Sequence, residues 1–214
     1  MTTVASLTLD DVFACSPVIP VLVIKRLEDA IPMVKALADG GINVVEITLR
    51  TECALDAIRA IRTELPEVMT GAGTVLTPED LQAVVDAGGQ FIVTPGATEE
   101  LLAAGRDAKI PFIPGVASVS EAMTAMSYGH RYLKFFPAEA NGGVPALKSL
   151  TGPLQGLKIC ATGGIKPSNM NDYLSLSAVP CIGGTWLTPD ELVDAKAWDQ
   201  ITALAKEAIA IHNA

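Results

Sequence analysis

Basic residues are scarce in this sequence. It has 15 Lys and Arg against 24 Asp and Glu, which gives a formal net charge of −9. A chain of this charge has no basic stripe to neutralise phosphates, so we expect no nucleic-acid partner. Any anionic substrate would have to be attracted by a local site, because the overall charge repels it.

Signals for membrane insertion, secretion and metal binding are also missing. No apolar run approaches the roughly 18 residues of a membrane helix, and residues 1–16 lack the basic and long apolar segments of a signal peptide. The two histidines, His130 and His212, lie far apart, and no CxxC motif occurs. We therefore expect a cytoplasmic protein with no metal site and no membrane partner. Its cysteines, expected to be reduced thiols, are Cys15, Cys53, Cys160 and Cys181.

The sequence does contain an alternation of apolar runs and helical segments. Half of its residues are hydrophobic but only 5% are aromatic, a composition typical of buried parallel strands. The expected strands are 18–24, 44–50, 69–75, 91–96, 111–116, 131–136, 158–164 and 179–184. The expected helices are 7–15, 28–39, 53–65, one that begins after Thr77, one that begins after Ser118, and 190–212.

This alternation predicts an α/β fold with a parallel sheet and right-handed crossovers. Eight strand–helix units in 214 residues fit a (β/α)8 TIM barrel with a short N-terminal helix. No linker or low-complexity run divides the chain, so residues 1–214 are expected to form a single domain. The alternative is a doubly wound open sheet, but its GxGxxG fingerprint is absent after the first strand, and residues 71–73 match it only in part.

A lysine lies in the middle of the sixth expected strand. The stretch from Arg131 to Glu139 is apolar and aromatic, and Pro137 ends the strand. Burial of a charged Lys134 is unfavourable, and desolvation favours the neutral amine, which can form a Schiff base with a carbonyl substrate. The alternatives are that Lys134 pairs with a carboxylate or reaches solvent from an edge strand.

Polar side chains of several strands are expected to converge near this lysine. In the second strand Glu46, Thr48 and Arg50 share one parity, which in a barrel points inward and toward the C-terminal mouth, where active sites are built. A structural alternative is a buried network of ion pairs that joins Glu46, Arg50 and Lys134. The other polar residues expected at this mouth are Thr74, Lys134 and Thr162.

Paired glycines follow the last two strands. The seventh strand ends at Gly163-Gly164, and the eighth ends at Gly183-Gly184. Loops at these two places commonly bind phosphate in TIM barrels, because glycine lets the backbone N–H groups approach an anion closely. The alternative is that the glycines only make tight turns between strand and helix.

Seven motifs carry a family resemblance. They are VEITLRT (45–51), GAGTVLTPED (71–80), FIVTPG (91–96), PFIPGV (111–116), KFFPAEANGG (134–143), ATGGI (161–165) and CIGGTWLTP (181–189). Together and in this order they closely resemble the family of 2-keto-3-deoxy-6-phosphogluconate (KDPG) aldolase and 4-hydroxy-2-oxoglutarate (KHG) aldolase. The resemblance covers essentially the whole chain.

The resemblance implies particular roles for residues of this sequence. Lys134 would form a Schiff base with pyruvate, and Glu46 would be the general acid and base. Arg50 and Thr74 would contact the pyruvyl group, with Thr162 beside them. The phosphate-binding residues that it implies are Gly163, Gly164, Gly184 and Thr185, where many relatives have GGSW in place of this chain's GGTW. The resemblance implies no cofactor, and it implies that the protein assembles into a homotrimer.

The activity implied is that of a class I aldolase that acts on a small phosphorylated keto acid. It would cleave 2-keto-3-deoxy-6-phosphogluconate to pyruvate and glyceraldehyde 3-phosphate, and 4-hydroxy-2-oxoglutarate to pyruvate and glyoxylate. A related pyruvate aldolase for a different 2-keto-3-deoxy sugar acid is the first alternative. The others are a phosphosugar isomerase in which Lys134 is only an electrostatic group, and a sugar-acid sensor without catalysis.

Overall fold

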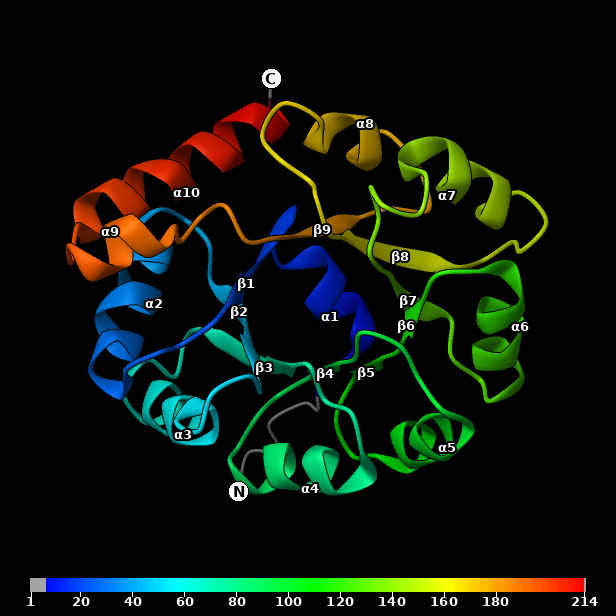
Figure 1. Cartoon of the computed structure of the whole chain (residues 1–214), viewed down its shortest axis with the longest axis horizontal. Coiled ribbons are helices and arrows are strands. Elements are labelled where there is room, and N and C mark those ends of the chain that lie inside the picture. Colours follow the sequence, from blue (N-terminus) through cyan, green and yellow to red (C-terminus); the bar gives the residue numbers. More distant parts are fainter. Residues whose placement is uncertain (1–6, 214) are drawn as a thin grey trace.

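Parallel strands form the centre of the molecule and helices surround them, as Figure 1 shows for the computed structural model, which describes residues 7–213. The strands run in the spatial order β5-β4-β3-β2-β1-β9-β8-β7-β6. The predicted α/β barrel is therefore confirmed. The strands are β1 Val18–Leu22, β2 Val44–Thr48, β3 Met69–Gly73, β4 Ile92–Val93, β5 Phe112–Ile113, β6 Gly115–Val116, β7 Tyr132–Phe135, β8 Lys158–Thr162 and β9 Cys181–Gly184.

One strand of the barrel is interrupted, which is why nine short strands correspond to the eight predicted ones. Pro114 separates β5 from β6 and has no N–H to donate to the sheet. β5 pairs with β4, whereas β6 pairs with β7, so this single segment joins the two edges and closes the barrel. The side-chain oxygen of Thr94 accepts a hydrogen bond from the Gly115 N–H at 3.0 Å and bridges the interruption.

Helices cover the outside of the barrel in chain order (Figure 1). The predicted helix over 190–212 is wrong in one respect: it is divided into α9 and α10, with Lys196 between them at a φ of 52°. The helices are α1 Leu9–Ala14, η1 Leu27–Asp29 (a 3-10 turn), α2 Ala30–Asp39, α3 Ala54–Glu64, α4 Pro78–Asp86, α5 Glu99–Asp107, α6 Val119–Ser127, α7 Gly143–Thr151, α8 Met170–Leu174, α9 Asp190–Asp194 and α10 Trp198–Asn213.

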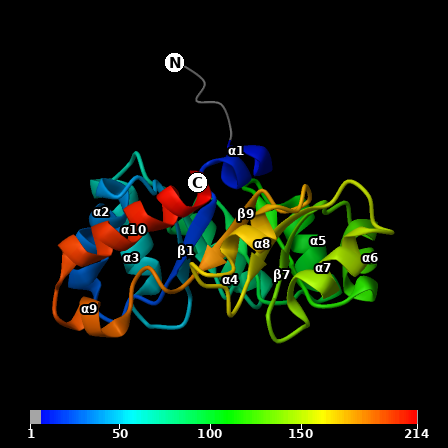
Figure 2. The ribbon, with the colours of Figure 1, turned by 90° about the horizontal axis from the view of Figure 1, so that it is seen from above.

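The short N-terminal helix α1 lies across one end of the barrel, as Figures 1 and 2 show together. Asp10 of α1 accepts a hydrogen bond from the hydroxyl of Tyr132, the first residue of β7, at 2.5 Å. The Phe13 ring also packs edge-on against the Tyr132 ring, with 5.1 Å between the ring centres. These contacts cover the end at which the strands begin, so the open mouth lies at the end where the strands finish.

The register of the strands fixes which residues meet inside the barrel. Gly115, Lys134, Cys160 and Cys181 are partners across β6, β7, β8 and β9. They form one layer, and Lys134 therefore lies deep in the barrel rather than on an edge strand. None of the helices in residues 7–213 has the length and apolar character needed to cross a bilayer.

Candidate active site

A buried lysine and a buried glutamate meet inside the barrel. Lys134 of β7 and Glu46 of β2 form an ion pair with 3.2 Å between Nζ and Oε1, and their side chains are only 6% and 2% exposed. Both the predicted convergence and the carboxylate pairing considered for Lys134 are therefore observed. Arg50 is exposed and forms no ion pair within the described part of the chain, so the three-residue network is not present.

Glu46 has room in the barrel because a glycine faces it. Gly73 is the last residue of β3 and the register partner of Thr48 on β2. A Cβ atom at Gly73 would overlap the Glu46 carboxylate. The glycine therefore leaves the space in which this carboxylate reaches the lysine ammonium, which explains one glycine of the GAGT motif.

The ammonium of Lys134 has an aromatic neighbour as well as its carboxylate partner. Its Nζ lies 5.3 Å from the centre of the Phe136 ring, a distance at which a cation is attracted to the ring face. A buried ion pair is a weak source of stability, because desolvation of two charges offsets most of their attraction. The arrangement is therefore better explained by chemistry than by stability.

These residues line a cavity of about 130 Å³ at the C-terminal ends of the strands. Of the predicted site residues, Gly184 is the one outside this lining. Successive residues of a strand face opposite sides, so Gly183 faces the cavity and Gly184 faces the Trp186 ring. The residues of the lining are Val21, Glu46, Thr48, Arg50, Thr74, Pro95, Lys134, Phe136, Thr162, Gly163, Gly164, Ile165, Gly183 and Thr185.

Four of these lining residues were not predicted: Val21, Pro95, Phe136 and Ile165. All are apolar or carry no ionisable group, so nothing in their chemistry marks them in the sequence. Pro95, Phe136 and Ile165 do lie inside recognised motifs, and their position one to three residues after the end of a strand is the signal that could have found them. They make the walls of the cavity apolar around a few polar groups, as is usual for small-molecule sites.

Thr74 reaches the cavity through an unusual backbone conformation. Its φ is 57°, a region that β-branched residues avoid. Backbone strain of this kind costs about 1–3 kcal/mol and occurs mostly at functional sites. Because Thr74 follows β3 directly, the turn brings its side chain to the mouth beside Arg50.

A pair of thiols lies beside the ion pair in the same layer of the barrel. A hydrogen bond with Cys181 lowers the pKa of the Cys160 thiol, and the positive charge of Lys134 acts in the same direction. The same hydrogen bond, together with burial, raises the pKa of Cys181. The Cys160 sulfur also lies 3.8 Å from the Thr162 hydroxyl, so the thiols belong to the polar surroundings of Lys134.

The cavity opens toward one side of the mouth. A second hollow, of about 380 Å³, shares Val21, Arg50 and Thr185 with it and extends toward Lys25 and Asp190. These two residues form an exposed ion pair with 2.8 Å between Nζ and Oδ2. A ligand that extends out of the cavity therefore has further space beyond Arg50 and Thr185.

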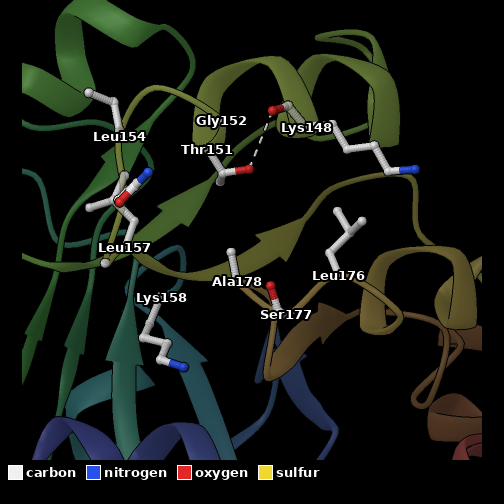
Figure 3. Close-up of a pocket in the computed structure, with 11 residues that line it drawn as sticks. Lys148, Thr151, Gly152, Leu154, Leu157, Lys158, Leu176, Ser177 and Ala178 are labelled. Carbon is white, nitrogen blue, oxygen red and sulfur yellow. Dashed lines mark hydrogen bonds between the residues drawn. The ribbon is translucent and has the colours of Figure 1, made fainter.

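A larger hollow lies elsewhere in the described part of the chain. It measures about 570 Å³ and is formed by the end of α7, the start of β8 and the connection before β9, at the end of the barrel opposite the mouth (Figure 3). Its lysines, Lys148 and Lys158, extend in different directions in Figure 3 and are exposed. No buried ionisable group lines it, so the smaller cavity around Lys134 is the better candidate for catalysis.

The cavity can therefore do three things. Lys134 is a nucleophile for a carbonyl group once its ammonium has lost a proton, and Glu46 lies close enough to exchange that proton. Arg50 can hold a carboxylate. The N–H groups around Gly163 and Gly164, both at positive φ (108° and 79°), can hold a further anion.

Comparison with known proteins agrees with this chemistry. The family model described as "KDPG and KHG aldolase" matches residues 9–204. The chain is similar to the KHG/KDPG aldolase of Escherichia coli strain K12, with 54% identity over 200 residues and 94% of each chain covered. It is also similar to the 2-dehydro-3-deoxy-phosphogluconate aldolase of Dickeya dadantii, with 52% identity over 201 residues and 94% of each chain covered.

A solved structure is similar over the same length. It is the KDPG aldolase of Legionella pneumophila, with pyruvate captured at low pH as a covalent carbinolamine intermediate. Its TM-score is 0.91 and its sequence identity 49%, and the match covers 92% of this chain and 96% of that chain.

Proposed function

Because the chain belongs to the KDPG and KHG aldolase family, we propose that it is a class I aldolase that forms a Schiff base with its substrate. Its reactions are the cleavage of 2-dehydro-3-deoxy-6-phosphogluconate to pyruvate and glyceraldehyde 3-phosphate, and of 4-hydroxy-2-oxoglutarate to pyruvate and glyoxylate. The observation that carries this proposal is the buried Lys134, whose Nζ lies 3.2 Å from Glu46 Oε1 at the bottom of the cavity.

The first step joins the substrate to the protein. Lys134 gives a proton to Glu46 and, as a neutral amine, attacks the keto carbon C2 of the substrate. The carbinolamine then loses water, with Glu46 as the acid, and leaves a protonated imine. The positive charge of this iminium group makes it an electron sink next to C3.

The second step breaks the bond between C3 and C4. Glu46 takes the proton of the C4 hydroxyl, directly or through one water molecule, and the aldehyde leaves. The two electrons of the broken bond pass to the iminium group and form an enamine. Glu46 returns the proton to C3, and hydrolysis of the resulting imine frees pyruvate and Lys134.

Binding groups around the pair hold the two ends of the substrate. We assign the substrate carboxylate to the Arg50 guanidinium, which can bind both of its oxygens, with Thr74 and Thr162 beside the pyruvyl carbons. The phosphate is assigned to the turn of Gly163 and Gly164 and to the Thr185 hydroxyl. Gly184 is better assigned to packing against Trp186 than to direct contact with phosphate.

We also propose that the chain acts as a single domain, is located in the cytoplasm and assembles into a homotrimer. The family resemblance supports the trimer, and the four free cysteines support the location, because thiols stay reduced in the cytoplasm. Light scattering of the purified protein measures the assembly directly. A mass equal to one or two chains would contradict the trimer without affecting the chemistry of the cavity.

Substrate specificity is tested by turnover. Pyruvate release should be measured with 2-dehydro-3-deoxy-6-phosphogluconate, with its galactose epimer, with its unphosphorylated form and with 4-hydroxy-2-oxoglutarate. We expect release from the first and last of these acids. Faster cleavage of the epimer or of the unphosphorylated sugar acid would assign the chain to a different pyruvate aldolase of the same type.

Removal of divalent metal ions is expected to leave turnover unchanged. The iminium group withdraws electrons from the C3–C4 bond, which is the role that a metal ion has in the other class of aldolases. The measurement is pyruvate release before and after prolonged treatment with EDTA. Loss of activity that a divalent ion restores would contradict the Schiff-base mechanism.

Replacement of Gly164 by valine is expected to raise KM for the phosphorylated substrate by about 10-fold or more, the scale of one lost hydrogen bond to a charged group. The φ of Gly164 is 79°, and a Cβ atom there would lie 2.7 Å from Glu139 Cβ, so the turn has to move. Formation of the pyruvate imine, which does not need the phosphate site, is expected to be unchanged.

Gly129→Val is the matched control for Gly164→Val. Gly129 has a φ of 95° and open space around the position of a Cβ atom, so this variant has similar backbone strain at the far end of the barrel. If both variants reduced imine formation and phosphate affinity equally, the glycines would serve the fold and not the phosphate.

A further inference from the structure

A tyrosine and a glutamate outside the cavity form a hydrogen bond beside the two-glycine turn, Gly163 and Gly164, which joins β8 to α8. Glu139 lies between β7 and α7, and Tyr173 lies in α8. The Tyr173 hydroxyl donates a hydrogen bond to Glu139 Oε1. Neither residue lines the cavity, and the mechanism above uses neither of them. Figure 1 shows α7 and α8 as neighbours above β8, with the turn beginning at the end of that strand.

Backbone N–H groups near Glu139 bind the carbonyl groups of the two-glycine turn. The N–H of Ala138 donates to the carbonyl oxygen of Thr162 at 2.8 Å, and the N–H of Glu139 donates to that of Gly163 at 3.0 Å. In a trans peptide the C=O and the following N–H point in opposite directions in one plane. These two bonds therefore direct the N–H groups of Gly163 and Gly164 away from the 136–142 segment.

The side chain of Glu139 holds the same turn by packing. A Cβ atom at Gly164 would lie 2.7 Å from Glu139 Cβ and 2.8 Å from Glu139 Cγ, so the glutamate stem lies directly against this glycine. Two successive glycines at positive φ have little conformational preference of their own. The shape of the turn therefore depends on what packs against it from outside.

The tyrosine fixes the position of this glutamate. Tyr173 is 1% exposed, and its burial, together with its bond to the Glu139 carboxylate, raises the pKa of its phenol. The phenol therefore stays protonated and remains a donor. The bond lies beside Gly143, the first residue of α7, where the positive end of the helix dipole favours a carboxylate.

We propose that Glu139 and Tyr173 are positioning residues for phosphate recognition: their hydrogen bond holds the Gly163–Gly164 turn in the shape that binds a substrate phosphate. The proposal rests on the function proposed above and assigns a source for preference toward phosphorylated acids. Imine formation at Lys134 does not depend on the pair, because neither side chain reaches the cavity.

The test compares Tyr173→Phe with the unchanged protein. The phenyl ring keeps the buried packing, but the hydroxyl that holds Glu139 is lost. We expect KM for 2-dehydro-3-deoxy-6-phosphogluconate and the inhibition constant of inorganic phosphate to rise about 10-fold, the scale of one hydrogen bond to a charged group. KM for 4-hydroxy-2-oxoglutarate and the rate of borohydride trapping of pyruvate are expected to be unchanged.

Tyr128→Phe is the matched control. Tyr128 also donates its hydroxyl to a glutamate, Glu99 Oε2, at 3.1 Å, but at the start of α5 and away from the cavity. This variant is expected to keep all four constants. Glu139→Gln, whose amide oxygen still accepts the bond, should resemble the unchanged protein, whereas Glu139→Ala, which also removes the Cγ that lies against Gly164, should be impaired at least as much as Tyr173→Phe. The Tyr173→Phe/Glu139→Ala double variant should be little worse than Glu139→Ala alone, because the hydrogen bond is already lost in that variant.

Other results would overturn the inference. If Tyr173→Phe raised KM equally for both acids, the pair would be a general structural contact. If the inhibition constant of inorganic phosphate were unchanged in Tyr173→Phe, the hydrogen bond would have no role in the shape of the turn. If the unchanged protein neither cleaved the two acids nor trapped pyruvate, the proposed function would be wrong. Calorimetric titration with inorganic phosphate would still test the pair, with about 10-fold weaker binding expected in Tyr173→Phe.

Discussion

Lys134→Met is expected to lose turnover by more than about 10⁴-fold, the order of loss when an enzyme is deprived of its covalent nucleophile. Methionine has nearly the length of lysine and fits a buried strand, but it cannot form an imine. Without the imine the electrons of the C3–C4 bond have no acceptor. Pyruvate release from the phosphorylated acid measures the loss, and Lys158→Met, at the exposed start of the neighbouring strand β8, is the control.

The same variant leaves a carboxylate buried without its partner. Removal of one member of a buried ion pair destabilises a protein by about 3–5 kcal/mol, and Glu46 is only 2% exposed. The Lys134→Met/Glu46→Gln double variant has no such charge and should recover most of the free energy of unfolding, but no turnover. A double variant that regained activity would show that the loss in Lys134→Met came from misfolding.

Glu46→Gln is expected to fold normally and to lose turnover by about 10²–10⁴-fold, the usual contribution of a general acid–base group. The amide has the size of the carboxylate and can still bond to Lys134, but it cannot carry the proton. Exchange of the pyruvate methyl protons with solvent, followed by NMR in deuterated water, should fall by a similar factor because it needs the same base.

Pyruvate and borohydride should still label Lys134 slowly in Glu46→Gln. Dehydration of the carbinolamine needs acid catalysis, so the imine forms more slowly, but prolonged treatment with borohydride still reduces it. If the variant exchanged the methyl protons at the normal rate, Glu46 would be only the partner of a buried lysine, and another group or a bound water would be the base.

The barrel could be predicted because its signals are local. Each strand–helix unit has its own apolar run and its own capping or glycine signal, as at Thr77, which caps α4 through its side chain. The division between α9 and α10 could not be predicted. The residues there, Ala195, Lys196 and Ala197, favour helix, and the turn depends on how α10 packs against α2, where Thr202 donates to the Ala36 carbonyl at 2.9 Å.

The residues of the cavity could be predicted where the alternation of side chains along a strand shows which of them point into the barrel. Glu46 and Lys134 were expected inside the barrel from their own strands, and closure of the barrel brings them to 3.2 Å. Gly184 could not be placed in this way, because both β9 glycines are small and apolar and neither parity is marked. The Tyr173–Glu139 bond joins residues 34 positions apart through the packing of α8, which no sequence pattern describes.

The central claim is that pyruvate becomes covalently attached to Lys134. The direct measurement is mass spectrometry of peptides after incubation with pyruvate and borohydride, alongside borohydride alone. We expect one reduced pyruvyl group per chain, located on Lys134, with activity lost in proportion to labelling. Labelling of Lys25 or Lys158 instead, or full retention of activity with no adduct, would contradict the Schiff-base assignment.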